Sequence, residues 1–289
     1  MSTMQARLAA LPVVALVLLA LANQVSPPRR IVSLIPAVTE MLFAIGDGQR
    51  LVGVTSYDHF PPQVSRIARV GGLLDPDVER ILALRPDLVI VYNTQVELKQ
   101  RLDRAGIGYY SYEHRALPDI TATLKAIGAR IGSADRANAA AAGMEHAFAA
   151  IRSNLSGTAH PRTMLVFERD PSSLRNIYAS GGYGFLHDML EAAGGRNVFD
   201  DLKQQSVEVT TEIALARQPD VIIELWYGDS VSALDLPRRR LAWNALGSVP
   251  AVRDHRVYEL VGDEFVVPGP RVVDATRRLA RTLHPEKYR

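Results

Sequence analysis

The 289-residue chain contains no cysteine. That absence excludes disulfide bonds, thiolate metal sites, a cysteine nucleophile and a lipid-modified cysteine. The chain also lacks an excess of charge of one sign, since 33 Lys and Arg residues stand against 31 Asp and Glu residues. Such a balance is not typical of a nucleic-acid-binding protein. Because 47% of the residues are hydrophobic, the chain can still bury one large core or two medium ones.

Long hydrophobic runs are scarce as well, and the one that approaches a membrane span lies at the start of the chain. Residues 8–22 carry no charge, follow Arg7 and end in small residues at Ala20 and Ala22. A short positive segment, an apolar run of about 15 residues and a small-x-small end are typical of a secretory signal peptide. We therefore expect residues 1–22 to be cleaved and the mature protein to reach the periplasm. An uncleaved membrane anchor is the alternative, although a span needs roughly 20 apolar residues.

The rest of the chain alternates apolar strands with helical periodicity, in two series. The strands expected are 31–35, 51–54, 88–91 and 107–111 in the first half, and 163–167, 221–223 and 256–260 in the second. Alternating strands and helices are typical of a parallel sheet covered by helices on both faces. We therefore expect an α/β protein with two lobes, each built on a parallel sheet.

A helical stretch separates the two series. Residues 117–155 are rich in Ala, Leu and Ile, and Gly128, Gly132 and Gly143 lie within them, so one bent helix or two abutting helices both fit. The expected organisation is a signal peptide at 1–22, an N-terminal lobe at 23–116, a connecting helix at 117–157 and a C-terminal lobe at 158–289.

One segment occurs in both halves. Residues 79–90 and 212–223 each read as a helix that starts with a glutamate, a Pro-Asp turn and a buried strand. One copy on each side of a helical connector indicates two lobes of similar construction.

Arrangements of residues typical of enzymes are sparse. The seven histidines are scattered, and none stands in the H-x-x-x-H or H-E-x-x-H spacing of a zinc hydrolase. The Gly-rich segment 180–184 lacks the Lys-Ser/Thr of a phosphate loop, and G-x-S-x-G does not occur. We therefore expect no catalytic activity, no metal site and no resident cofactor. An exported metal-dependent hydrolase is the alternative from another class.

Several segments resemble the substrate-binding proteins of vitamin B12 and iron-siderophore ABC importers. They occur in family order between Arg30 and Leu283 and are Arg30–Leu34, Pro36–Phe43, Leu51–Tyr57, Val70–Gly72, Pro86–Ile90, Gly194–Phe199 and Pro268–Val272. The cobalamin-binding branch is the most similar, through Tyr57 ahead of a double proline and through the Pro-Gly-Pro-Arg start of the last helix. The resemblance implies the class III, TroA-like fold, in which two Rossmann-like lobes are joined by a rigid helix and hold the ligand between them.

The resemblance also implies roles for particular residues. The expected ligand contacts are Tyr57, Tyr92, Tyr178 and Asp263, and the expected contacts with the permease are Glu79 and Glu212. Rigid aromatics suit a large, partly apolar ligand. The alternatives are that the tyrosines are ordinary rim residues, that Asp263 is an ordinary loop acid, and that the two glutamates are first-turn residues favoured by the helix dipole.

The implied ligand is a corrinoid, and an iron-siderophore or haem is the alternative. For haem, Tyr57, His59 or Tyr92 could supply the axial ligand. The implied partner is an inner-membrane permease dimer with its ATPase subunits, and the binding protein itself is expected to be a monomer.

Overall fold

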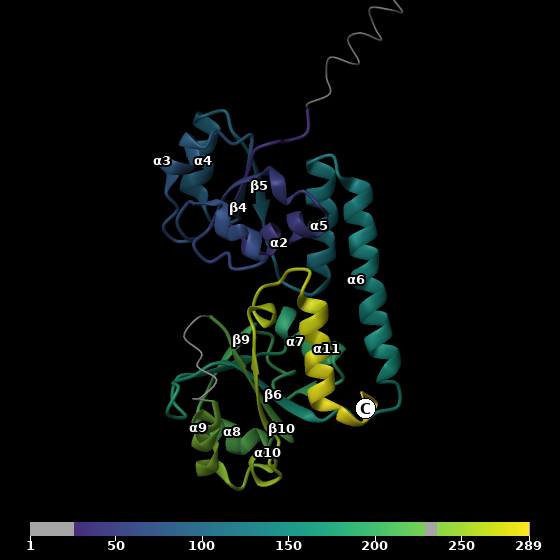
Figure 1. The fold of residues 1–289 in the computed structure, drawn as a ribbon. Coiled ribbons are helices and arrows are strands. Elements are labelled where there is room, and N and C mark those ends of the chain that lie inside the picture. The colour runs from purple at the N-terminus through teal and green to yellow at the C-terminus, as the bar shows by residue number, and fades with distance from the viewer. Residues whose placement is uncertain (1–25, 229–235, 289) are drawn as a thin grey trace, which may run out of the picture.

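The structure, a computed structural model, describes residues 26–228 and 236–288. These residues form two α/β lobes that lie one above the other, with helices packed along one side (Figure 1). The expected signal peptide at 1–22 lies outside the described residues. Within the described part of the chain, no helix has the length and apolar character needed to cross a membrane.

The N-terminal lobe is built on a five-stranded sheet that is parallel throughout, in the order β3-β2-β1-β4-β5. Its strands are β1 (Ile31–Ser33), β2 (Leu51–Val54), β3 (Ala68–Arg69), β4 (Leu88–Tyr92) and β5 (Gly108–Tyr112). Its helices are α2 (Pro36–Ala44), α3 (Val78–Ala83) and α4 (Val96–Arg104), with short 3-10 helices η1 (Gly48–Arg50) and η2 (Pro62–Arg66). The apolar residues of β1 and β4 are fully buried because both faces of the sheet are covered.

Two helices, α5 (Pro118–Arg130) and α6 (Ala134–Asn154), occupy the range expected for the connector. The chain turns between them at Gly132, whose φ of +73° suits a glycine. Gly128 of α5 lies so close to Ala137 of α6 that a Cβ on Gly128 would come within 2.1 Å of the alanine Cβ. Of the two alternatives left open by the sequence, the structure therefore has two abutting helices. Figure 1 shows that α6 runs alongside both lobes.

The C-terminal lobe is built on a mixed sheet in the order β11-β10-β6-β7-β9, with β8 paired to β6. Its strands are β6 (Arg162–Glu168), β7 (Ile177–Ser180), β8 (Arg196–Asn197), β9 (Ser206–Val209), β10 (Val221–Trp226) and β11 (Val257–Val261). Its helices are α7 (Phe185–Ala192), α8 (Thr211–Arg217), α9 (Leu236–Arg240), α10 (Pro250–Arg253) and α11 (Val272–Leu283), with 3-10 helices η4 (Leu241–Leu246), η5 (Asp263–Phe265) and η6 (Pro285–Lys287).

The expectation of a wholly parallel sheet is wrong for this second lobe. Strand β7 runs antiparallel to both β6 and β9. The reason is the short link between β6 and β7, residues 169–176, because a parallel crossover needs about a dozen residues or more. The chain instead turns back directly, with Asn176 at φ +50°. The two-lobed α/β architecture itself is confirmed.

One continuous hydrophobic core joins the lobes. The cluster contains Ile31 and Leu88 of the first sheet, Leu165 and Val221 of the second, and the buried face of α6 between them. That face consists of Ala137, Ala141, Met144, Phe148 and Ile151. The outer faces of the two sheets have separate clusters. The lobes are therefore held to one another by shared packing as well as by the chain connection.

Candidate functional site

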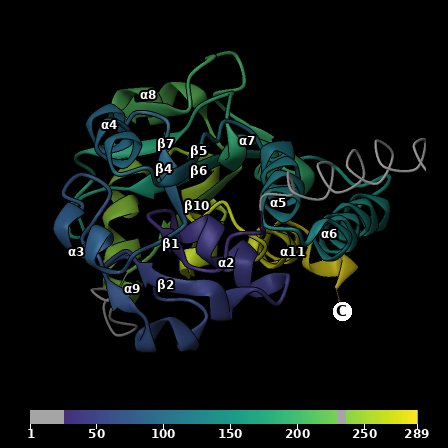
Figure 2. The same ribbon diagram turned by 90° about the horizontal axis from the view of Figure 1, so that it is seen from above.

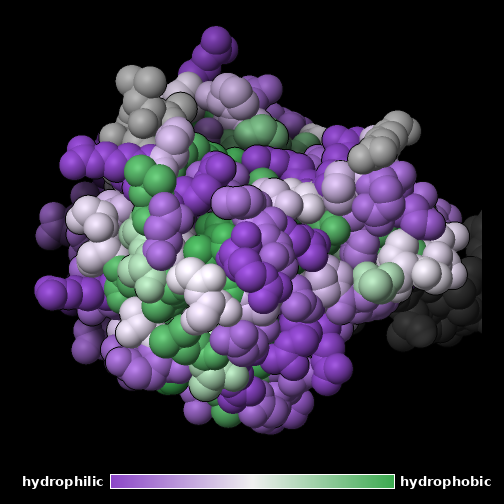
Figure 3. Space-filling model, turned by 90° about the horizontal axis from the view of Figure 1, so that it is seen from below, coloured by the Kyte–Doolittle hydropathy of each residue, from purple (hydrophilic) through white to green (hydrophobic). Residues whose placement is uncertain are grey.

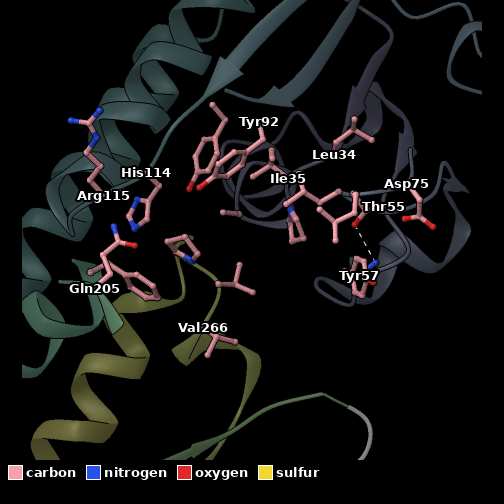
Figure 4. Close-up of a pocket in the computed structure, with 18 residues that line it drawn as sticks. Leu34, Ile35, Thr55, Tyr57, Asp75, Tyr92, His114, Arg115, Gln205 and Val266 are labelled. Carbon is pink, nitrogen blue, oxygen red and sulfur yellow. Dashed lines mark hydrogen bonds between the residues drawn. The ribbon is translucent and has the colours of Figure 1, made fainter. Parts of the chain in front are cut away.

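A cleft of about 800 Å³ lies where the strand ends of the N-terminal lobe face the C-terminal lobe (Figure 4). The N-terminal lobe contributes Leu34, Ile35, Pro36, Ala37, Thr55, Tyr57, Leu73, Leu74, Asp75, Tyr92, Tyr112, His114 and Arg115, and the C-terminal lobe contributes Phe185, Gln205, Val266, Val267 and Pro268. Most of the first group follow the carboxyl ends of β1, β2, β4 and β5. Ligands of open parallel sheets bind beyond these ends, so the position is typical of a binding site.

An aromatic row forms one wall of the cleft and crosses from one lobe to the other. Tyr92 and Tyr112 end neighbouring strands in register, and their rings meet edge to face at 5.7 Å between centroids. Tyr112 is parallel to the imidazole of His114 at 6.4 Å, and His114 meets Phe185 of the other lobe at 5.2 Å. A wall of this kind offers a large apolar surface with a few polar edges.

Tyr57 is presented by a loop that its own hydrogen bonds hold in place. The backbone N–H of Tyr57 donates to Thr55 Oγ1 at 3.1 Å, and the Thr55 hydroxyl donates to Asp58 Oδ2 at 2.6 Å. The guanidinium of Arg69 donates to the backbone oxygens of Thr55 and Asp58 at 2.6 and 2.9 Å. Tyr57 itself is 66% exposed. The loop is thus ordered before any ligand arrives, while the ring is free to cover one.

The electrostatics of this loop follow from burial. Burial raises the pKa of the Asp58 carboxyl, while hydrogen bonds from Thr55 and the charge of Arg69 lower it. Asp58 is therefore a buried acid that holds the loop in place, while the ring of Tyr57 lines the cleft.

Polar atoms without partners lie at the aromatic wall. Among the described residues, Tyr112 Oη and both ring nitrogens of His114 are buried and have no hydrogen-bond partner. Burial raises the pKa of the Tyr112 phenol and lowers the pKa of the His114 imidazole. Both side chains are consequently neutral near pH 7, and both can hydrogen-bond a neutral group.

Charge is rare on the cleft wall. Of the described residues that line it, only Asp75 and Arg115 carry a full charge near neutral pH, and Figure 4 shows them at opposite ends of the cleft. Arg115 is further engaged with Glu113, whose Oε1 accepts from Arg115 Nε at 2.7 Å. In the part of the chain that the structure describes, no three His, Asp or Glu side chains are grouped as metal ligands would be.

Two of the four expected ligand contacts line this cleft, namely Tyr57 and Tyr92. Tyr178 lies within β7, half-buried, and is outside the described lining. Asp263 begins η5, where its Oδ1 accepts from the backbone N–H of Gly228 at 3.0 Å, and it too is outside that lining. The geometry of the cleft gives no support to Tyr178 or Asp263 as contacts, and their role stays a prediction.

Sequence reasoning missed Tyr112, His114, Phe185 and Gln205. A signal existed for the first two, because they follow the expected strand 107–111 just as Tyr57 and Tyr92 follow theirs. Phe185 and Gln205 come from the other lobe, and no local pattern marks them.

The two expected permease contacts occupy equivalent places in the two lobes. Glu79 and Glu212 are exposed and lie in the first turns of α3 and α8. Each helix has a side-chain cap, since Asp77 accepts from the N–H of Arg80 at 2.9 Å and Thr210 accepts from the N–H of Ile213 at 3.3 Å.

These two helices share a side of the molecule. Figure 2 shows α3 and α8 on the side away from α6. Figure 3 shows a different surface, the underside of the C-terminal lobe, where hydrophobic residues lie in several separate patches among hydrophilic ones. Hydrogen bonds from Thr210 and from the backbone of Glu212 itself lower the pKa of the Glu212 carboxyl.

Comparison with known proteins defines the class. A family model described as periplasmic binding protein matches residues 31–263. The chain is 30% identical over 257 residues to the vitamin B12-binding protein of Salmonella typhimurium, which covers 88% of this chain and 90% of the relative. It is 27% identical over 268 residues to YvrC of Bacillus subtilis, an uncharacterized ABC transporter substrate-binding lipoprotein, covering 91% of this chain and 82% of that one.

A solved structure supports the same assignment. The periplasmic haem-binding protein RhuT of Roseiflexus has a TM-score of 0.74 and 25% identity, covering 90% of this chain and 99% of that one. The chain belongs to the periplasmic binding protein family, and within it to the type that includes vitamin B12 and haem binders. The protein is accordingly a substrate-binding protein of an ABC transporter. Its relatives are periplasmic binding proteins or substrate-binding lipoproteins rather than enzymes.

Proposed function

We propose that the protein captures a corrinoid such as cobalamin in the cleft between its lobes and delivers it to a membrane permease. The observation that carries this proposal is the lining of the cleft, which is aromatic, largely apolar and almost free of charge. A corrinoid is a large ring system with neutral amide side chains around its edge, and it gains from stacking on rigid aromatics with polar tips.

Charge separates the candidate ligands. Haem carries two carboxylates, and buried or half-buried carboxylates are normally paired with cations. Among the described lining residues, Arg115 is the one cation, and Glu113 already accepts from it. A ferric catecholate siderophore keeps a net negative charge on its complex and would need still more positive charge. A neutral ligand therefore fits this lining better than either.

Haem is the second candidate, and one observation favours it. Tyr57, Tyr92 and His114 line the cleft, and a phenolate or an imidazole can serve as an axial ligand to haem iron. His59, also expected as a candidate, is exposed and lies outside the described lining.

Direct titration distinguishes these ligands. Purified mature protein is titrated by calorimetry with cyanocobalamin, haemin and a ferric catecholate siderophore, each in a separate experiment. We expect cyanocobalamin to bind at least tenfold more tightly than haemin, a difference of about 1.4 kcal/mol. Tighter binding of haemin, together with a shift of its Soret band, would replace the corrinoid by haem.

Delivery to the permease rests on Glu79 and Glu212. One exposed carboxylate on each lobe suits a two-fold symmetric partner that presents cations, and such charge pairs set orientation and association rate. The double variant Glu79→Lys/Glu212→Lys should abolish uptake in cells and leave ligand affinity unchanged.

A matched control is available on a neighbouring helix. Glu97 is exposed and lies in the first turn of α4, so it shares the helix-dipole environment of Glu79. Glu97→Lys should leave uptake intact. Normal uptake by the double variant would show that the two glutamates are merely favourable first-turn residues.

A further inference from the structure

Unpaired polar atoms are concentrated at one point of the cleft. Tyr112 is only 3% exposed, yet its hydroxyl has no partner among the described residues, and the same holds for both ring nitrogens of the adjacent His114. Buried polar groups in native proteins are almost always hydrogen-bonded, and an exception calls for an explanation such as an absent ligand. Both residues line the cleft.

The charged groups around this pair are occupied elsewhere. Asp119 Oδ2 accepts from the backbone N–H groups of Arg115 and Ala116 at 2.8 and 2.9 Å. Asp188 Oδ2, from the other lobe, accepts from the backbone N–H of Leu117 at 2.9 Å. Both carboxylates are close enough to influence the pKa of His114, but neither hydrogen-bonds it. The protein itself therefore leaves the pair free for another group.

We infer that Tyr112 and His114 form a carboxamide-binding subsite that selects an amide side chain of the ligand over a carboxylate. The inference rests on the proposed function, because it assigns the corrinoid's peripheral amides to this wall. The phenol donates to the amide oxygen, and the neutral imidazole accepts from the amide N–H through its unprotonated nitrogen.

The imidazole can meet the ligand without losing its packing. A half-turn about the Cβ–Cγ bond leaves the ring in the same plane, so the parallel contact with Tyr112 persists while nitrogens and carbons exchange places. The two orientations have nearly the same shape. Each lateral edge of the ring carries one nitrogen in either orientation, and the half-turn changes only its position along the edge.

A carboxylate is a poor partner for the same pair. It has no proton to donate to the imidazole, so one side of the subsite would remain unsatisfied. Its charge would also lie against Tyr92 and Phe185, which flank the pair, with no free cation among the described lining residues. Burial keeps the phenol and the imidazole neutral, as the direction of both pKa shifts indicates.

The test compares cyanocobalamin with its peripheral monocarboxylic acids, in each of which one amide has been hydrolysed. Affinities are measured by calorimetry at pH 7.5 for the wild type, Tyr112→Phe and His114→Phe. For the acid whose altered group faces the subsite, we expect the wild type to bind at least tenfold more weakly than it binds cyanocobalamin. Both variants should lower this ratio at least threefold by losing affinity for the amide form, and the part that remains is the cost of placing a charge against Tyr92 and Phe185.

The melting temperature of each variant distinguishes a ligand-binding role from a structural one, because loss of a structural residue would lower it. Each variant keeps a ring of similar size and removes unpaired polar atoms, so its melting temperature should equal or exceed that of the wild type. Tyr109→Phe is the control, because Tyr109 lies on the same strand and outside the described lining. It should change neither affinity nor selectivity.

The outcomes are distinguishable. If the wild type binds cyanocobalamin and all the acids equally, the subsite is refuted while the proposed function stands. An unchanged selectivity in both folded variants refutes it as well. If the wild type does not bind cyanocobalamin at all, the proposed function fails and the subsite fails with it.

Discussion

The two lobes share a repeated helix-turn-strand unit, and each holds a buried polar cluster, but these two clusters differ in how far their hydrogen bonds are satisfied within the protein. In the C-terminal lobe, Glu224 on β10 is ion-paired with Arg169 and accepts from Trp243 Nε1 at 2.8 Å. The remaining N–H groups of Arg169 donate to backbone oxygens, including that of Asp170 at 2.7 Å. In the N-terminal lobe, Tyr112 and His114 have no partner among the described residues. The hydrogen bonds of Arg169 and Glu224 are completed within the C-terminal lobe and stabilise it. The polar atoms of Tyr112 and His114 lack such partners in the described part of the chain, and by our inference they bind the ligand.

Removing the guanidinium of Arg169 should cause the largest loss of unfolding free energy, because it breaks the buried hydrogen-bonded cluster of the C-terminal lobe. The side chains of Arg169 and Glu224 are 0% and 1% exposed, so Arg169→Met leaves a buried carboxylate uncompensated. Loss of one partner of such a pair costs about 3–5 kcal/mol of unfolding free energy. Urea denaturation followed by tryptophan fluorescence measures the loss.

An exposed ion pair in the same lobe is the control for this variant. Arg196→Met removes a partner of Asp200 from the surface and should cost about 1 kcal/mol or less. The double variant Arg169→Met/Glu224→Met should recover part of the stability lost in Arg169→Met. Equal stability of Arg169→Met and the wild type would remove the proposed distinction between the lobes.

A second prediction concerns the join between the lobes. Arg271, which precedes α11, donates to Glu40 of α2 through Nε at 3.0 Å, and the Glu40 side chain is 4% exposed. Burial raises the pKa of Glu40, while the hydrogen bond and charge of Arg271 lower it. Glu40→Ala should cost about 1.5–3 kcal/mol, the range of hydrogen bonds to charged groups.

The same urea titration measures this variant. Glu97→Ala, at an exposed helix position, should stay within about 0.5 kcal/mol of the wild type. A Glu40→Ala protein as stable as Glu97→Ala would show that the ion pair does not hold the lobes together.

A third prediction sharpens the role of the N-terminal lobe in ligand binding. Tyr57 is mostly exposed, so Tyr57→Ala should leave stability nearly unchanged and weaken corrinoid binding at least tenfold, or about 1.4 kcal/mol. Calorimetry with cyanocobalamin gives the affinity. Tyr178→Ala is the comparison, since Tyr178 lies outside the described lining of the cleft: full affinity would remove the contact expected from the sequence, and a loss of affinity would support it. The reverse pattern would transfer the contact to Tyr178.

The smallest effect should come from the titration of His114. Its pKa is lowered by burial, against the opposing influence of Asp119 and Asp188, so the unfolded chain binds its proton more readily than the folded protein does. The stability that the neutral ring contributes is therefore complete above pH 6.5, the ordinary value, and is lost as the pH falls through the lowered pKa.

The measurement is a melting-temperature series between pH 5 and pH 8. His114→Phe should remove the part of the pH dependence that lies below pH 6.5. An identical profile for the variant and the wild type would show that His114 does not titrate with folding.

The sequence predicts the alternation of strands and helices well, because the apolar runs of β1, β4 and β10 are continuous and each is bounded by a turn. Strands β7 and β9 escape prediction, since Ile177–Ser180 and Ser206–Val209 contain no such run and are strands only because they pair with β6 and with one another. Tertiary pairing, rather than local preference, decides these segments.

The site is predictable to the extent that it follows strand ends. Tyr57 and Tyr92 come just after or at the end of a recognisable strand, and Tyr112 obeys the same rule although it was overlooked. Phe185, by contrast, joins the aromatic row only because α7 packs against the end of β5 across the lobes. Such a contact depends on how two lobes meet, and no single segment encodes it.

The helix α6 has a mechanical consequence. Because α6 is packed into both lobes within one core, a change in the width of the cleft would have to disturb that packing, and we expect the two lobes to move little relative to one another. A cleft of nearly fixed width lowers the free-energy cost of binding, because little has to be ordered when the ligand enters. It also limits the spontaneous opening that would release the ligand. We therefore expect ligand release to need a partner that separates the two lobes.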